Sequence, residues 1–234
     1  SIQEIIIIPY SNDKANNNYT DWNKIFENNS QFTKFLNLPF NHPLYILYSS
    51  GTTGVPKCIV HGAGGSLIQH LKEHQLHLNI QENDKVFYFT TCGWMMWNWL
   101  ISSLASKATI LLFDGSPFVP NYSNLFNIAK KEKINFFGTG AKYIDTLKNQ
   151  KINIKNNFDL PDLKVVSSTG SPLSNESFEY VYNFIKKDVQ LSSISGGTDI
   201  VSCFLLGNPS SSVFSGEIQC AGLGMDVDIF NDNG

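Results

Sequence analysis

Residues 48–57, with the sequence YSSGTTGVPK, gather hydroxyl groups, glycines and one cation into a short stretch. Gly51 and Gly54 permit backbone conformations that other residues avoid, so consecutive N–H groups can point at one anion. Lys57 adds a positive charge. Four hydroxyl-bearing side chains complete the group: Ser49, Ser50, Thr52 and Thr53. Donors of this kind on a flexible backbone predict a binding site for a polyphosphate.

This stretch is not a P-loop, because its spacing differs from GxxxxGK[ST] and Pro56 removes one amide donor. Lys57 therefore does not open a helix wrapped around the phosphate. We expect the loop to lie over its ligand as a mobile flap. A polar linker is the alternative interpretation, but the dense hydroxyls and the lysine serve no packing purpose.

Two more glycine-rich segments follow predicted strands, STGSPLS at 168–174 and SGGTD at 195–199. Ligands of open α/β sheets bind at the carboxyl ends of the strands. The three segments are therefore expected to converge on one site. Taken singly, each is weaker evidence, because a glycine turn between a strand and a helix needs no ligand.

The order of predicted elements favours an α/β fold. From Lys85 onward, strands and helices alternate, which predicts parallel sheets with helices on both faces. After Val201 apolar and polar residues alternate around glycines, which predicts a small antiparallel β-subdomain. We divide the chain into an α/β segment with the phosphate loop (1–80), a second α/β segment (81–204) and the start of a β-barrel-like segment (205–234).

Composition limits the classes of partner. The net charge is −3, so no nucleic acid or anionic membrane is expected as a partner. The longest apolar runs, EIIIIPY and ATILLF, fall short of the ~20 residues that a membrane helix needs. The cysteines form no CxxC pair, and we expect them to be reduced, buried side chains of a cytoplasmic protein. They are Cys58, Cys92, Cys203 and Cys220.

The glycine-rich segments, taken in order, resemble the signatures of the adenylate-forming superfamily of acyl- and aryl-CoA synthetases, luciferases and peptide-synthetase adenylation domains. YSSGTTGVPK is similar to its phosphate loop, STGSPLS to its GGAPL turn, SGGTD to its YGxTE segment, and SGEIQ at 215–219 to a later GE segment. The resemblance covers essentially the whole chain. HPLYILYSSGTTGVPK, TTCGWMMWNWL and SISGGTDIVSCF resemble most the members that join acetoacetate to coenzyme A.

The resemblance implies a reaction in two steps. A carboxylate attacks the α-phosphate of Mg-ATP, which gives an acyl-AMP and pyrophosphate, and the thiol of coenzyme A then displaces AMP. The first step joins two anions, so it requires charge neutralisation at the phosphates. The implied ligands are ATP or AMP, Mg²⁺, coenzyme A and a small acid, with acetoacetate expected and acetate, propionate or butyrate as alternatives.

Within that mechanism the resemblance implies catalytic roles for three residues. Lys57 would hold the β and γ phosphates together with the loop hydroxyls, and Thr198 would hold an α-phosphate oxygen. Asp199 stands where the family usually has glutamate, as the ligand of Mg²⁺; a hard cation accepts either, although aspartate is one methylene shorter. Alone, Asp199 would be interpreted as a turn or N-cap residue. The residues 170–172 would lie along the adenine. In all, the resemblance implies further nucleotide contacts for Ser49, Gly51, Gly54, Gly170, Ser171, Pro172, Ser195, Gly196 and Gly197.

The acid pocket is expected between SGGTD and the tryptophan-rich segment at 94–99. Ser195 and Gly196 stand where similar acetate-activating enzymes carry tryptophans, so the pocket gains room for a longer acid. A hydrophobic pocket discriminates by only about 1–3 kcal/mol per methylene, so a polar group must recognise the keto oxygen. We expect Trp94 to form a wall and Asn98 to donate to the keto group. Plain core packing is the alternative, and it is expected for Met96 and Trp99.

His70, His74 and His77 are spaced at i, i+4 and i+7, which places them on one helix face. No cysteine or carboxylate is placed to complete a structural zinc site, so we expect a solvated face without a biological metal. His61 follows a predicted strand and precedes glycines. It is expected either to reach the active site or to be a buried structural histidine.

The family's catalysis also uses a mobile C-terminal domain in cis, whose lysine completes the adenylation site. The ribose-binding aspartate of the family likewise lies beyond the residues aligned here. We therefore expect the 234 residues alone to bind ATP weakly and to form no thioester at a useful rate. A non-catalytic nucleotide-binding module is the remaining alternative.

Overall fold

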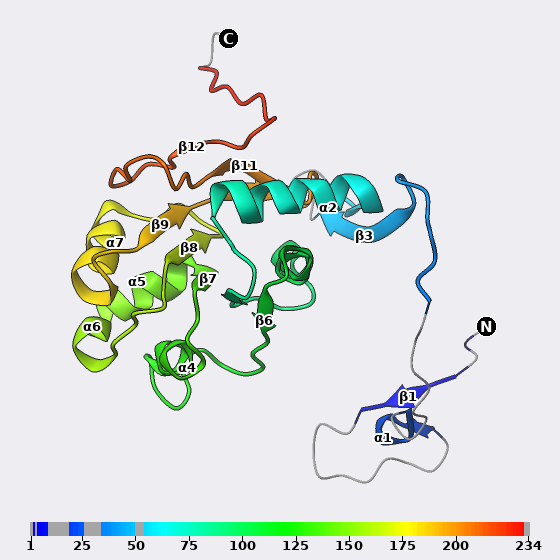
Figure 1. The fold of residues 1–234 in the computed structure, drawn as a ribbon, viewed down its shortest axis with the longest axis horizontal. Helices are drawn as coiled ribbons and strands as arrows, with labels where there is room; N and C mark the ends of the chain where they lie inside the picture. The colour runs from blue at the N-terminus through cyan, green and yellow to red at the C-terminus, as the bar shows by residue number, and fades with distance from the viewer. Residues whose placement is uncertain (1, 3, 9–18, 26–33, 50–53, 232–234) are drawn as a thin grey trace. The chain divides into compact units, whose positions relative to one another are not determined.

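The computed structural model describes residues 2, 4–8, 19–25, 34–49 and 54–231. They belong to two compact units, Ser1–Leu38 and Pro39–Gly234. In the first unit, β1 (Ile6–Ile7) pairs in parallel with β2 (Thr20–Asp21), and the short helix α1 (Trp22–Ile25) follows. Figure 1 labels the helices and strands of both units. All described residues that line the candidate site belong to the second unit.

A five-stranded sheet forms the centre of the second unit, and all of its neighbouring strands are parallel. The spatial order is β6-β5-β7-β8-β9. The strands are β5 (Lys85–Tyr88), β6 (Thr109–Leu111), β7 (Phe136–Gly140), β8 (Val165–Thr169) and β9 (Gln190–Ser193). This sheet confirms the α/β fold that the alternating pattern predicts.

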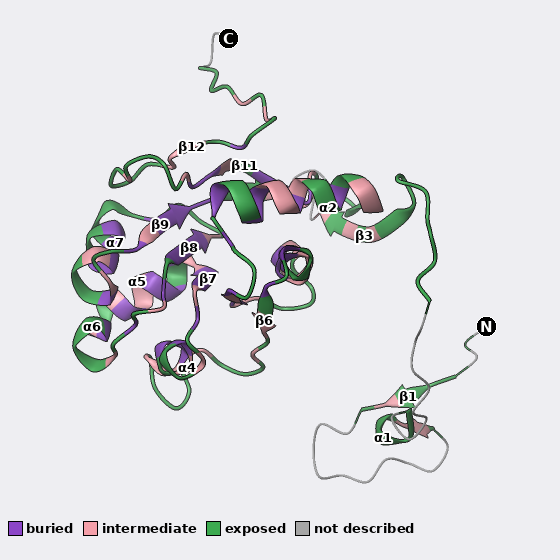
Figure 2. Ribbon diagram, viewed as in Figure 1, coloured by how far each residue is buried: buried purple, intermediate pink, exposed green. Residues whose placement is uncertain are grey.

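Helices cover both faces of this sheet because successive side chains of each strand point to opposite sides. Phe87 and Phe137 belong to one buried cluster, whereas Val86 and Phe136 pack with Trp99 in a second cluster on the other side of the sheet. Figure 2 shows β8 and β9 largely in the colour of buried residues. One face carries α4 (Asn124–Glu132), α5 (Ala141–Asn149), α6 (Ile154–Asn157), α7 (Asn175–Tyr180) and η3 (Val181–Ile185). The other carries α2 (Ala63–Lys72), η1 (Glu73–His77), α3 (Met95–Ser102) and η2 (Ser103–Ser106).

Two antiparallel elements flank the parallel sheet. The hairpin of β3 (Pro43–Ser49) and β4 (Lys57–Gly62) leads directly into α2. The second element is a three-stranded sheet of β10 (Ser195–Gly197), β11 (Ser202–Leu206) and β12 (Cys220–Ala221). It begins at Ser195, ahead of residue 205. The division into 1–80, 81–204 and 205–234 stays a prediction.

The cysteines differ from the expectation of uniform burial. Cys203 is buried and Cys220 is half-buried, but Cys58 and Cys92 are exposed. Cys58 lies on the exposed side of β4, and Cys92 lies in the turn before α3. All four are free thiols.

None of the helices in the described ranges is long and apolar enough to cross a membrane.

Candidate active site

A cavity of about 960 Å³ opens at the carboxyl ends of β5, β7, β8 and β9. It is the place where the topology of a parallel sheet brings loop residues together. Of the thirteen predicted site residues that the structure describes, eight lie in its lining. The predicted site residues among its lining are Trp94, Gly170, Ser171, Pro172, Ser195, Gly196, Gly197 and Thr198.

The turn after β8 depends on a glycine. Gly170 has φ +87°, in the left-handed region that residues with a Cβ avoid. Just before it, Thr169 donates from Oγ1 to the carbonyl of Ile194 over 3.0 Å. This bond ties the end of β8 to the end of β9, so the two glycine-rich segments keep a fixed relation to each other.

Gly196 is required by the pairing of β10 with β11. A Cβ at this position would lie 2.2 Å from the backbone oxygen of Ser202 and 2.7 Å from Cα of Cys203. A Cβ at Gly197 would come no closer than 3.9 Å, to the ring of Phe204. Backbone contact therefore excludes any residue with a Cβ, tryptophan included, from position 196 unless β11 moves.

The turn between β10 and β11 carries the two residues expected at the α-phosphate and the metal. Thr198 lines the cavity. Asp199 is exposed in the turn and is not among the described lining residues. Val201 ends the turn with φ +49°, although it is β-branched and only 2% exposed. A buried β-branched residue in this conformation is a strained backbone position.

The phosphate-loop prediction falls partly outside the described residues, because it includes Ser50, Gly51, Thr52 and Thr53. The ends of the loop are described: Ser49 of β3 pairs with Lys57 of β4, and Gly54 has φ +147°. None of these three lines the cavity. Their roles at the phosphates stay predictions.

His61 links the hairpin to the cavity. Its Nε2 lies 2.8 Å from the carbonyl oxygen of Thr198, and because a carbonyl carries no proton, the imidazole is the donor. His61 lies on β4 opposite Tyr45 of β3. His61 is half-buried and does not line the cavity, so it contacts the site only through the backbone of Thr198.

The start of α3 faces the cavity, but its second turn does not. Trp94 is the N-cap residue, is 62% exposed and lines the cavity together with Met95 and Met96. Trp99 is fully buried, as expected of core packing. Asn98 lies one turn into the helix, outside the cavity lining, and its carbonyl accepts from Ser102 Oγ over 2.9 Å. Its role as keto-group donor therefore gains no support.

The start of α5 contributes residues that the sequence reasoning missed. Gly140, Lys142 and Tyr143 line the cavity, and Lys142 is the only residue with a formal charge among the described lining residues. The sequence feature that could have identified them is the segment GTGAK, a fourth glycine-bearing strand end followed by a helix.

Two tyrosines also line the cavity. Burial raises the pKa of both Tyr88 and Tyr143, so these phenols are neutral.

The histidine face was predicted wrongly: all three residues are buried. His70 and His74 are 0% exposed and His77 is 4% exposed, because α2 and η1 pack against α3 and β11. His74 lies edge-on to the ring of Trp99, 4.2 Å between centroids, and burial lowers its pKa to about 3. The spacing identified one face of the helix but not what covers it.

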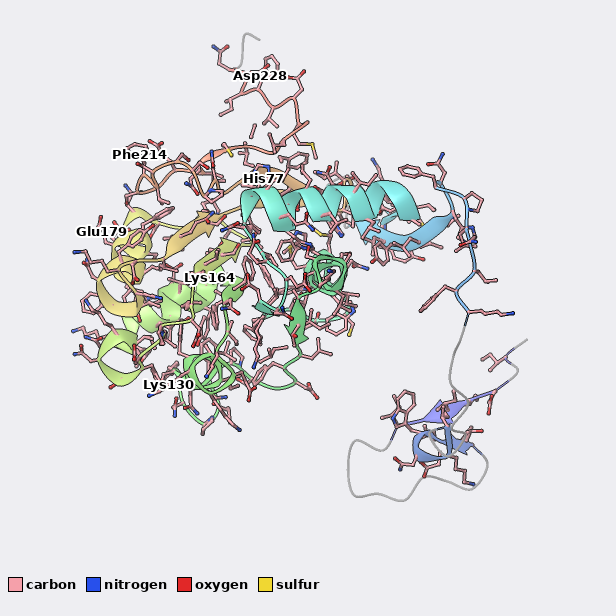
Figure 3. All side chains as sticks on the ribbon, in the orientation of Figure 1. His77, Lys130, Lys164, Glu179, Phe214 and Asp228 are labelled. Atoms are coloured by element: carbon pink, nitrogen blue, oxygen red, sulfur yellow. The ribbon has the colours of Figure 1, made fainter. Side chains whose placement is uncertain are left out.

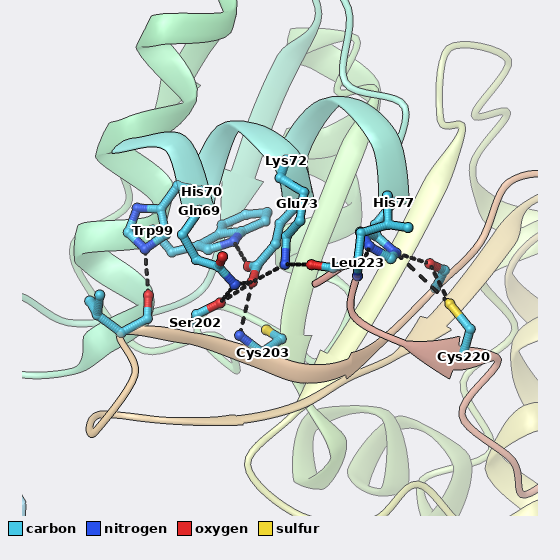
Figure 4. Close-up of polar contacts among 12 residues, drawn as sticks. Gln69, His70, Lys72, Glu73, His77, Trp99, Ser202, Cys203, Cys220 and Leu223 are labelled. Atoms are coloured by element: carbon cyan, nitrogen blue, oxygen red, sulfur yellow. Dashed lines mark hydrogen bonds and ion pairs between the residues drawn. The ribbon is translucent and has the colours of Figure 1, made fainter. Parts of the chain in front are cut away.

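The other two histidines bind backbone groups of the antiparallel sheet region (Figure 4), and Figure 3 labels His77 among all the side chains. His70 donates from Nε2 to the carbonyl of Val201 over 2.5 Å, and burial lowers its pKa. His77 donates from Nδ1 to Gly207 over 2.9 Å and accepts at Nε2 from the N–H of Leu223 over 3.0 Å. The helix thereby holds the backbone on both sides of β11 and the segment after β12.

Comparisons with known proteins agree with this geometry. The sequence matches the family described as AMP-binding enzyme over residues 3–234. It is 60% identical over 200 residues to acetoacetyl-coenzyme A synthetase of Rhizobium meliloti (strain 1021), covering 86% of this chain and 31% of that protein. It is 53% identical over 201 residues to acetoacetyl-CoA synthetase of Gallus gallus, covering 86% of this chain and 30% of that protein.

A solved structure matches as well. The acetoacetyl-CoA synthetase from Streptomyces lividans is similar with a TM-score of 0.91 at 37% sequence identity, over 100% of this chain and 36% of that one. The chain thus spans about a third of the length of the relatives that it matches.

Proposed function

The chain belongs to the AMP-binding enzyme family, and on that premise we propose that it supplies the ATP- and acid-binding part of an acetoacetate–CoA ligase. In the proposed reaction, acetoacetate attacks the α-phosphate of ATP to give acetoacetyl-AMP and pyrophosphate. The thiol of coenzyme A then attacks the acyl carbon, and AMP leaves. The similarity to three acetoacetyl-CoA synthetases supports the choice of acid.

One observation carries the proposal: the ends of β8, β9 and β10 and the start of α3 line a single cavity. The turn at 170–172 would lie along the adenine, and Thr198 would donate to an α-phosphate oxygen. Trp94 would form the wall of the acid subsite. Lys57 would reach the β and γ phosphates from the hairpin, where a positive charge offsets the repulsion between the two anionic substrates.

The residues present fit a magnesium ion near the phosphates. Asp199 is an exposed carboxylate in the same turn as Thr198, which lines the cavity, and carboxylate oxygens are ligands that Mg²⁺ accepts. When bound, the ion would supply additional neutralisation of phosphate charge. The chain's contribution is to hold Asp199 and Thr198 on one short turn.

The acid subsite needs a group that tells acetoacetate from butyrate, which lacks only the C3 carbonyl. Lys142 suits this task better than Asn98, because its charged side chain belongs to the cavity lining and Asn98 does not. Lys142 is exposed at the edge of the cavity, and its ammonium group would donate a charge-assisted hydrogen bond to the C3 carbonyl oxygen. A site built around a polar contact rejects analogues that lack the partner far more strongly than an apolar pocket does.

Pyrophosphate release tests the proposal against activation of another short acid. The 234 residues would replace the matched region of the Streptomyces lividans enzyme, and release would be compared for acetoacetate, acetate, propionate and butyrate. We expect acetoacetate to give a kcat/KM at least about tenfold above butyrate. A higher value for acetate, propionate or butyrate supports the alternative acid. A folded hybrid that releases no pyrophosphate with any acid contradicts the proposal.

A further inference from the structure

We propose that His61 and His70 are positioning residues that fix the turn from Thr198 to Val201 and so couple the phosphate-loop hairpin to the metal-binding carboxylate. The inference rests on the proposed function, because it takes Thr198 and Asp199 as the groups that meet ATP and Mg²⁺. Neither histidine lines the cavity, so each acts through the backbone of the turn.

The first contact holds the start of the turn. His61 donates from Nε2 to the carbonyl of Thr198 over 2.8 Å, and the N–H of Val201 approaches the same oxygen at 3.3 Å. His61 lies on β4, the strand that begins at Lys57. This one strand therefore connects the lysine expected at the β and γ phosphates with the residue expected at the α-phosphate.

The second contact holds the end of the turn. His70 donates from Nε2 to the carbonyl of Val201 over 2.5 Å (Figure 4). Its Nδ1 lies 2.8 Å from Ser102 Oγ. The bonded carbonyl belongs to the residue with φ +49°. Strained backbone persists where surrounding contacts over-determine it, and it concentrates at functional sites. The buried imidazole is such a contact.

Asp199 lies between the two fixed carbonyls. With both ends of a four-residue turn bonded, rotation of its peptide groups is restricted, so the backbone that carries Thr198 and Asp199 is held in one conformation. The arrangement prepares the turn for a metal–phosphate complex before the ligand arrives, which lowers the entropy cost of binding. We therefore expect the loss of either histidine contact to weaken ATP binding in the presence of Mg²⁺ more than in its absence.

Isothermal titration calorimetry of the 234-residue chain with ATP, in Mg²⁺ and in EDTA, tests this coupling. His61→Leu is expected to weaken ATP binding about five- to tenfold in Mg²⁺ and less than about twofold in EDTA, the size of one hydrogen bond. His61→Gln, which keeps an N–H donor, is expected to restore most of the loss. His42→Leu, at an exposed histidine, serves as the matched control.

The outcomes separate the coupling from the proposed function. An equal loss in both conditions, no loss in either, or failure of His61→Gln to restore binding overturns the coupling. His70→Gln, with thermal unfolding measured in parallel, provides a second variant: a folded protein with unchanged magnesium dependence also overturns it. A wild-type chain that binds no ATP in Mg²⁺ contradicts the proposed function itself.

Discussion

The indole N–H of Trp99 donates to Oε2 of Glu73 over 2.9 Å, and both residues are 0% exposed. The other carboxylate oxygen accepts from the N–H of Cys203 over 3.0 Å and contacts the hydroxyl of Ser202. Lys72 Nζ lies 3.9 Å from that oxygen. A buried carboxylate is tolerated only when it is paired in this way. Glu73 thus connects η1 by hydrogen bonds to α3 and to the start of β11, the strand that follows the turn carrying Thr198.

Removing this carboxylate should destabilise the chain strongly. We expect Glu73→Leu to lower the free energy of unfolding by about 3 kcal/mol or more, because several buried donors lose their acceptor at once. Urea denaturation followed by circular dichroism measures it. Glu82→Leu is the matched control, since Glu82 pairs with Lys107 at an exposed site and such pairs contribute about 1 kcal/mol or less. Equal losses in the two variants would contradict the structural role of Glu73.

Stability should fall as the solution is acidified, because His74 is held neutral. Its pKa is about 3 in the folded chain and near 6.5 when unfolded, so the unfolded state binds more protons between these values. The free energy of unfolding should therefore decrease as pH drops from 6.5 towards 3, by up to ~1.4 kcal/mol per pH unit from this group.

His74→Phe removes the titrating group and keeps a ring against Trp99. We expect a flatter pH dependence of unfolding for this variant than for the wild type. Urea titrations at a series of pH values give the slopes directly. A His74→Phe slope identical to the wild type would show that another group controls acid stability.

The two neighbouring glycines of β10 should respond differently to alanine. Gly196→Ala places a Cβ against the backbone of Ser202 and must displace β11, so we expect a loss of about 1–3 kcal/mol in stability and weaker ATP binding. Gly197→Ala meets only the ring of Phe204 at 3.9 Å and should be near neutral in both measurements. Comparable losses in the two variants would be inconsistent with the close approach of β10 and β11.

Lys142 should set the preference for a keto acid. Two probes test this, the sulfamoyladenosine analogues of acetoacetyl-AMP and butyryl-AMP, which differ at the C3 carbonyl of the acyl chain. Lys142→Met should weaken binding of the acetoacetyl probe by about tenfold and leave the butyryl probe within about twofold. Asn98→Ala should preserve the preference. If Asn98→Ala removes the preference and Lys142→Met keeps it, the roles are reversed.

The sequence predicts the framework of this site well, for physical reasons. The segments around Gly170 and Gly196 follow apolar strands, and a parallel sheet brings the ends of its strands to one edge. Their convergence on one cavity could therefore be expected before any coordinates. Alternation of strands and helices likewise identifies the α/β fold, because each strand must be buried on both faces.

Other features could not be predicted, because they depend on which element packs on which. The i, i+4, i+7 spacing places His70, His74 and His77 on one face, but burial of that face requires β11, more than a hundred residues later in the chain. The left-handed conformation of Val201 contradicts the local preference of a β-branched residue and exists only through tertiary contacts. Lys142 was missed because an exposed lysine at a helix start is ordinary, and only the packing of α5 beside the strand ends places it at the cavity.

The most direct test of the central claim is calorimetric titration of the 234-residue chain with the acetoacetyl and butyryl sulfamoyladenosine probes. The account predicts saturable one-to-one binding of the acetoacetyl probe, about tenfold or more tighter than that of the butyryl probe. A folded chain that binds neither probe would contradict the assignment of the cavity to an acyl-adenylate. Equal affinity for the two would contradict the assignment of acetoacetate as the acid.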